Sequence, residues 1–195
     1  LRQGLRLILE STQPDGRKDR PMELTSEDIE ILVGTANALL RSPEVRRMNG
    51  FLQHGRTSCL QHSLAVAYVS LCLRRLLHMR ADRYSLVRGA LLHDFFLYDW
   101  HEKHAGHNLH GWTHPATALR NARQRFALNT VEQNIISSHM WPFTLRRLPR
   151  SREAMLVNLA DKICSAREVC RAYPYRSMLR LLQTNRLAWT GFASP

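Results

Sequence analysis

The segment LVRGALLHD, residues 86–94, decides the fold of this chain. Its apolar residues lead directly into His93 and Asp94, and this pattern predicts a buried helix that carries an imidazole and a carboxylate into the protein interior. Both groups are common metal ligands. Further histidines and an aspartate occur in other segments with apolar patterns, namely His62, His114, His139 and Asp161. The resulting order, H…HD…H…H…D, predicts a metal site.

The spacing of these residues allows them to meet. Thirty-one positions separate His62 from His93, which is room for a helix, a turn and a returning helix. The steps from Asp94 to His114, from His114 to His139 and from His139 to Asp161 are 20, 25 and 22 positions, so each allows one helix crossing. Taken alone, a histidine on an apolar helix face is usually a hydrogen-bonded core residue, and a lone Asp161 usually pairs with Lys or Arg. Burying all six groups without partners would be costly, so the set favours a metal site at one end of a helical bundle.

Helical periodicity runs through most of the chain. The pattern predicts helices over 57–79, 84–97 and from Thr113 onward, and Thr25, Asn129 and Ser151 are expected to cap three others. No stretch alternates convincingly as a strand, and no window approaches the ~18 apolar residues of a membrane span. We therefore expect an all-α fold, a compact bundle of about seven to eight helices with the metal site in its core.

Composition limits the function classes. The 195 residues suit one domain, with or without a short appendage, and the net charge is +12, with 25 of the 28 cationic residues being Arg. Arginine matches phosphate oxygens, although solvated surface charge explains the excess more simply. The arginines are scattered without interleaved aromatic residues, which argues against nucleic acid as a partner. The four cysteines form no C-x-x-C pair and predict reduced core thiols in a cytoplasmic protein.

The ligand pattern resembles the HD-domain superfamily of metal-dependent phosphohydrolases, in its longer form with two extra histidines. The resemblance covers about residues 55–171. It implies that one metal is held by His62, His93, Asp94 and Asp161, and that His114 and His139 hold a second metal with Asp94 bridging. Donors of this kind suit Fe, Mn, Zn or Ni, so we expect two divalent transition-metal ions and a phosphorylated small-molecule substrate. Residues 51–195 would form the hydrolase domain, and residues 1–50 would add N-terminal helices and an exposed loop that pack on it.

The chain also departs from parts of that family. Phe95 and Phe96 stand where some signalling members carry Gly-Lys, and Leu97 stands where enzymes acting on deoxynucleoside monophosphates carry Glu. The expected catalytic residues are Asp94, Asp99 and Lys162, and the expected substrate-binding residues are His110, Arg146 and Arg147. For Asp99 a loop-capping role is an equal alternative, and for the two arginines surface charge is the simpler explanation.

The reaction expected from the resemblance is hydrolysis of a phosphate ester by a metal-activated hydroxide. The substrate would be a nucleotide, a cyclic dinucleotide or a smaller phosphoester. Two alternatives stay open: a mixed-valent di-iron oxygenase of the same superfamily, and a non-catalytic nucleotide-binding HD module. Nothing in the sequence indicates the oligomeric state.

Overall fold

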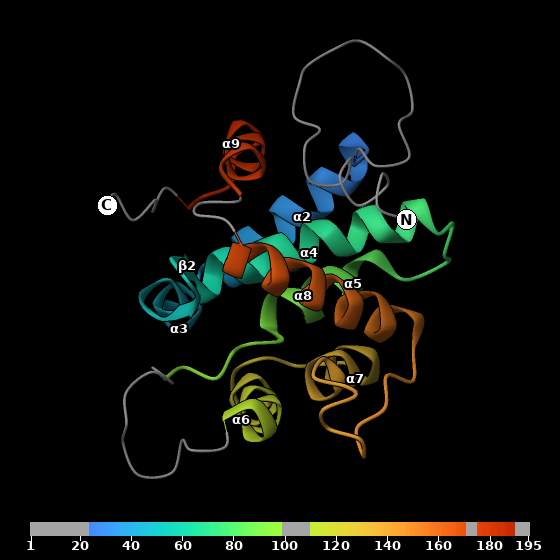
Figure 1. Cartoon of the computed structure of the whole chain (residues 1–195). Coiled ribbons are helices and arrows are strands. Elements are labelled where there is room, and N and C mark those ends of the chain that lie inside the picture. The colour runs from blue at the N-terminus through green and yellow to red at the C-terminus, as the bar shows by residue number, and fades with distance from the viewer. Residues whose placement is uncertain (1–23, 99–109, 171–174, 190–195) are drawn as a thin grey trace.

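The structure is a computed structural model that describes residues 24–98, 110–170 and 175–189 (Figure 1). Within these ranges it contains eight α-helices, a 3-10 turn η1 (Met48–Gly50) and one short hairpin. The helices are α2 (Ser26–Leu39), α3 (Pro43–Arg47), α4 (Cys59–Leu76), α5 (Arg83–Leu92), α6 (His110–Arg125), α7 (Thr130–Ser138), α8 (Arg152–Cys170) and α9 (Arg176–Thr184). The prediction of an all-α bundle of seven to eight helices is confirmed. Among the described helices, none has the length and hydropathy needed to cross a membrane.

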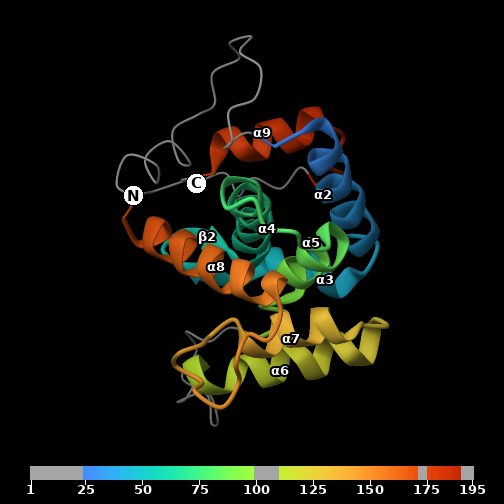
Figure 2. The ribbon, with the colours of Figure 1, turned by 90° about the vertical axis from the view of Figure 1, so that its right-hand side faces the viewer.

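The core is built around α4, which is buried along most of its length. Helices α5 and α8 pack against α4, α7 packs against α5 and α8, and α6 packs against α7 (Figure 2). Helix α2 also packs on α4 and α5, with Leu32 and Ala36 among its buried residues. Residues 1–23 lie outside the described ranges, and the division of the chain at residue 50 stays a prediction.

Three helix starts follow the expected capping residues. Thr25 Oγ1 accepts a hydrogen bond from the Asp28 amide at 3.1 Å, and Ser151 Oγ accepts one from the Ala154 amide at 3.1 Å. Asn129 exchanges side-chain and backbone hydrogen bonds with Glu132 in a complete capping box. Each contact satisfies an amide that a helix start leaves without an intrahelical partner.

The hairpin is a feature that the sequence pattern did not predict. Strand β1 (Leu52–His54) pairs antiparallel with β2 (Thr57–Ser58), so α4 begins at Cys59 with Ser58 as its cap, and not at 57. Gly55 makes the turn with φ +58°, a conformation that glycine adopts without strain. Strands of three and two residues are too short for an alternating pattern to stand out.

Two helix boundaries also differ from expectation. Helix α6 begins at His110, one turn before Thr113, so Pro115 lies inside it. Helix α5 ends at Leu92 with His93 as its C-cap, and the chain then turns so that Phe95 and Phe96 are buried. The apolar pattern continues to residue 97 because the residues after the helix end are buried, and not because the helix is longer.

A glycine permits the close approach of α5 and α7, two of the helices that position predicted ligands. A Cβ atom on Gly89 would lie 2.5 Å from Ile135 Cδ1, a distance that no real contact tolerates. The absence of a side chain at 89 thus permits the close approach of α5 to α7. Because His93 and His139 cap the C-terminal ends of these helices, this contact also positions two of the predicted ligands.

Candidate metal centre

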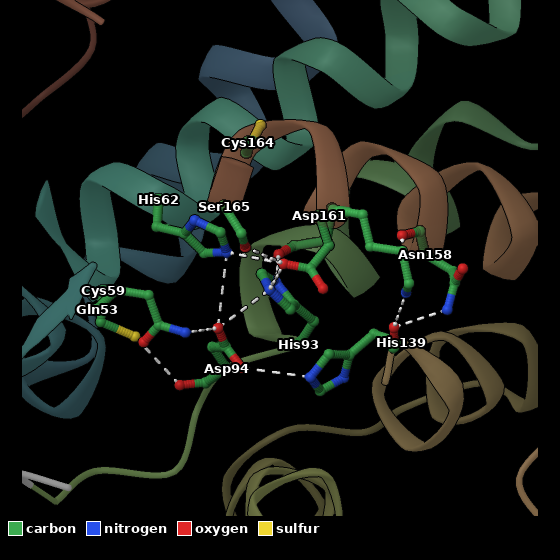
Figure 3. A network of polar contacts seen from close by, with 12 residues as sticks. Gln53, Cys59, His62, His93, Asp94, His139, Asn158, Asp161, Cys164 and Ser165 are labelled. Carbon is green, nitrogen blue, oxygen red and sulfur yellow. Dashed lines mark hydrogen bonds and ion pairs between the residues drawn. The ribbon is translucent and has the colours of Figure 1, made fainter. Parts of the chain in front are cut away.

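The structure brings the six predicted ligands to one place in the core. Figure 3 shows His62, His93, Asp94, His139 and Asp161 turned toward one another. His62 is the fourth residue of α4, Asp94 follows the C-cap of α5, and Asp161 lies in the middle of α8. All six residues are buried, and the most exposed of them, Asp161, is only 7% exposed. Ionisable groups are rarely buried to this extent unless they are paired or coordinate a metal.

The carboxylate of Asp94 divides the other ligands into two groups. Its Oδ2 lies 3.2 Å from His93 Nε2 and 3.7 Å from His62 Nε2. Its Oδ1 lies 3.3 Å from His114 Nε2 and 3.4 Å from His139 Nε2. Asp161 joins the first group, because its Oδ1 lies 3.1 Å from His62 Nε2 and 3.8 Å from His93 Nε2.

We call these groups position A and position B. Position A consists of His62, His93, Asp161 and Asp94 Oδ2, and position B consists of His114, His139 and Asp94 Oδ1. One carboxylate therefore faces both positions, one oxygen to each.

The donor atoms fit metal ions in both positions. Bonds of about 2.1 Å place neighbouring donors of one ion roughly 3.0–3.4 Å apart, and the distances within the two positions scatter around this range. The Nε2 atoms of His114 and His139 are 2.8 Å apart. Buried atoms His93 Nε2 and Asp94 Oδ1 make no hydrogen bond of acceptable geometry within the described residues. Such orphaned atoms are rare in folded proteins. A cation in position A would satisfy His93 Nε2, and a cation in position B would satisfy Asp94 Oδ1.

Three of the four histidines are oriented by partners behind them. His93 Nδ1 lies 2.7 Å from the Ala90 carbonyl, and His139 Nδ1 lies 2.9 Å from the Ile136 carbonyl. Each carbonyl belongs to the last turn of its helix, where it has no intrahelical donor. A proton on Nδ1 leaves the Nε2 lone pair directed to the centre, as in metal-binding histidines generally. The C-terminal ends of α5 and α7 also carry partial negative charge, which favours cations.

His62 is oriented by a buried carboxylate that the sequence analysis missed. Its Nδ1 lies 2.8 Å from Glu168 Oε1, and Tyr175 donates its hydroxyl to the same oxygen at 2.8 Å. Glu168 lies two helical turns after Asp161, so the two acids share a face of α8. That seven-residue spacing was the signal available in the sequence.

The electrostatics of the site pair imidazoles with carboxylates. Burial alone would lower the pKa of His62, but Glu168 and Asp161 raise that pKa well above its usual value. Burial alone would raise the pKa of Asp94, but His93 and the other imidazoles hold it well below its usual range. The carboxylates also raise the pKa of His93 against the effect of burial, whereas burial lowers the pKa of His139. Protons on His62 and His93 thus balance the carboxylates, and a divalent cation that binds here would displace them.

The structure places the remaining candidate residues less centrally. Lys162 is half-buried and its Nζ donates to the carbonyls of His139 at 3.2 Å and Asn158 at 3.3 Å. Burial lowers the pKa of Lys162, and the charge of Asp161 opposes this shift. The ammonium therefore lies behind a ligand of position B.

The two candidate arginines lie in the segment after α7. Arg147 lines a groove of about 420 Å³ together with Arg120 and Arg123 of α6. Nine residues separate His114 from Arg123, which places them on opposite faces of α6, so this groove is on the outer face. Arg146 is exposed. Asp99 lies outside the described residues, as does the side chain of His110, whose backbone begins α6. The roles expected for these residues stay predictions.

Comparison with known proteins gives one result. The family model of the HD domain matches residues 59–166, more than half of the 195 residues, and this range includes all six ligands. No curated protein and no solved structure matches the chain. The match, the helical bundle and the His/Asp cluster agree with one another, and the chain belongs to the HD-domain family, which consists mostly of metal-dependent phosphohydrolases.

Proposed function

We propose that this protein is a two-metal phosphohydrolase that cleaves a phosphate ester. The observation that carries the proposal is the orientation of Asp94, which presents Oδ2 to the histidines of position A and Oδ1 to those of position B. A bound metal pair supplies hydroxide near neutral pH and stabilises charge on the phosphate oxygens. Position A offers four protein donors and position B three, so position B has more room for water or a phosphate oxygen.

The protein's own residues have separate tasks in this proposal. Asp94 offers one carboxylate oxygen to each position and so fixes how the two positions lie relative to each other. The buried partners of His62, His93 and His139 hold the Nε2 atoms of these histidines toward the centre. The net charge of +12 attracts an anionic substrate. In this proposal Lys162 balances the negative charge of the phosphate near position B, and Asp99 protonates the leaving oxygen. The substrate is a nucleotide, a cyclic dinucleotide or a smaller phosphoester.

The test is the replacement Asp94→Ala. Protein purified without oxygen should contain two transition-metal ions per chain and hydrolyse bis(p-nitrophenyl) phosphate or members of a nucleotide panel. Asp94→Ala should lose both ions, and its hydrolysis should fall by more than the roughly 10–100-fold expected for a residue outside the ligand set. Asp82→Ala is the matched control, since Asp82 caps α5 at its other end and touches no ligand.

Two results would contradict the proposal. Full turnover by metal-free Asp94→Ala would separate the reaction from the site. Oxygen consumption by the iron-loaded protein, with no hydrolysis of any phosphoester, would show that the same ligands serve oxygenase chemistry.

A further inference from the structure

The β1–β2 hairpin brings an amide side chain to the metal centre. Gln53, the middle residue of β1, is 6% exposed, and its Nε2 donates to Asp94 Oδ2 at 2.6 Å (Figure 3). This contact is shorter than each of the ion-pair contacts that Asp94 makes with the four histidines. The sequence analysis assigned no role to this residue.

The same short segment also holds the backbone of Asp94. Cys59, which begins α4 directly after the hairpin, donates its thiol to the Asp94 carbonyl at 3.2 Å. Gln53 and Cys59 thus hold the side chain and the main chain of one residue.

The hairpin itself is held in place on several sides. The Cys59 amide donates to the Phe51 carbonyl at 2.8 Å, and Ser58 Oγ, the cap of α4, donates to Asn49 Oδ1 at 2.9 Å. At the turn, a Cβ atom on Gly55 would lie 3.2 Å from the Glu168 carbonyl oxygen. The hairpin is therefore packed between η1, α4 and α8, and the position of Gln53 follows from the fold.

A bridging carboxylate needs such a contact. The terminal torsion of Asp is broad and roughly two-fold, so the carboxylate plane turns easily unless something holds it. One hydrogen bond from Gln53 occupies one lone pair of Oδ2 and leaves another for position A, while Oδ1 keeps both of its lone pairs toward position B.

We propose that Gln53 is a positioning residue that holds the Asp94 carboxylate in the plane joining positions A and B. The proposal rests on the two-metal function proposed above. Gln53 Oε1 is buried and has no hydrogen-bond partner among the described residues. A buried amide oxygen needs a donor, and a water molecule or substrate hydroxyl at the centre is suited to supply it.

The test compares Gln53→Met with the wild-type chain, both freed of metal and titrated with Mn²⁺. Methionine has a similar length but donates no hydrogen bond. We expect the first ion to bind with nearly wild-type affinity and the second to bind roughly 10–100-fold more weakly. Two bridged Mn²⁺ ions give a spin-coupled electron paramagnetic resonance spectrum, and in the variant this should give way to the signal of isolated Mn²⁺. Gln133→Met, which removes an amide that accepts from Arg123 and donates to the Leu128 carbonyl, should leave both readouts unchanged.

Gln53→Leu is a second variant in case Gln53→Met does not fold, and only variants with wild-type helical circular dichroism and cooperative unfolding are compared. Wild-type affinity for both ions, together with an unchanged coupled spectrum, would overturn the proposal. A wild-type protein that binds two coupled ions but hydrolyses no phosphoester would refute the proposed function and leave the role of Gln53 intact. A wild-type protein that binds one ion would overturn both.

Discussion

Positions A and B share one carboxylate but are built differently. The donors of position A come from α4, α8 and the end of α5, three helices that pack directly on one another. Apart from the shared Asp94, those of position B come from α6 and the end of α7, and α6 packs on the outer side of α7. Position A has four protein donors, and position B has three. The comparison indicates a rigid, nearly complete site next to a more open one.

This difference has a chemical consequence. A site whose donors are already fixed by buried neighbours binds metal with little reorganisation, as at position A, where Glu168 holds His62 and Ser165 donates to Asp161 at 3.3 Å. A site with fewer protein donors keeps coordination positions for water and substrate, which is typical of catalytic metal ions. We therefore expect position A to fill first and position B to bind the reacting groups.

The largest effects should come from removing one ligand of each position. His114→Ala should lower the metal content from two ions per chain to one and leave the tighter ion in place. Asp161→Asn should remove the tighter ion, so that the remaining binding is weak. Both variants should lose hydrolysis, because each lacks one of the two ions. Elemental analysis and metal titration of the two variants measure the difference directly.

The comparison would fail in a definite way. If His114→Ala still holds two ions, His114 is not a ligand, and position B is not a metal site. If both variants keep one ion of equal affinity, the two positions do not differ in the manner that their packing indicates.

Much of this site could be predicted because its residues lie at regular helical positions. His62, His93 and Asp161 each lie in an apolar helical pattern, and periodicity reports which face of a helix is buried. The hairpin that carries Gln53 could not be predicted in this way, since its strands are too short to show a period. Gln53 is also uncharged, so nothing in its residue type marks it as a partner of a metal ligand.

Glu168 is a different case. Its seven-residue spacing from Asp161 is visible in the sequence, but the spacing alone does not indicate that Glu168 is buried beside His62. A glutamate near the end of a helix is usually solvated. Glu168 is buried because Tyr175 and His62 pack around it. His62 lies 106 residues away in the sequence, and Tyr175 lies beyond the end of α8. Such tertiary partners are set by the fold and not by local pattern.

A smaller effect is expected from Glu168→Gln. The change keeps the size of the side chain but weakens its bond to His62 Nδ1, so the affinity of position A should fall by roughly 10–100-fold. Position B should change little. Glu153→Gln is the matched control, because Glu153 is also a buried acid of α8 but accepts its hydrogen bond from the Asp82 amide. Equal weakening at both positions, or an equal effect of the control, would show that Glu168 acts on the fold and not on position A.

The smallest effect should follow from Gly89→Ala, which tests how the two positions are held together. The added Cβ would meet Ile135 Cδ1 at 2.5 Å, so α5 and α7 must move apart, and overpacking of this kind costs about 1–3 kcal/mol of unfolding free energy. The same change at Gly34 in α2 meets nothing within 4 Å and should stabilise the protein by about 0.5–1 kcal/mol through helix propensity. The urea unfolding midpoints of the two variants should therefore shift in opposite directions.

Because His93 lies at the end of α5 and His139 at the end of α7, the separation of these helices in Gly89→Ala should also weaken metal binding at position B more than at position A, whose donors do not include α7. Equal unfolding midpoints would show that α5 and α7 adjust without strain, and the contact at Gly89 would then not be what joins the two halves of the site.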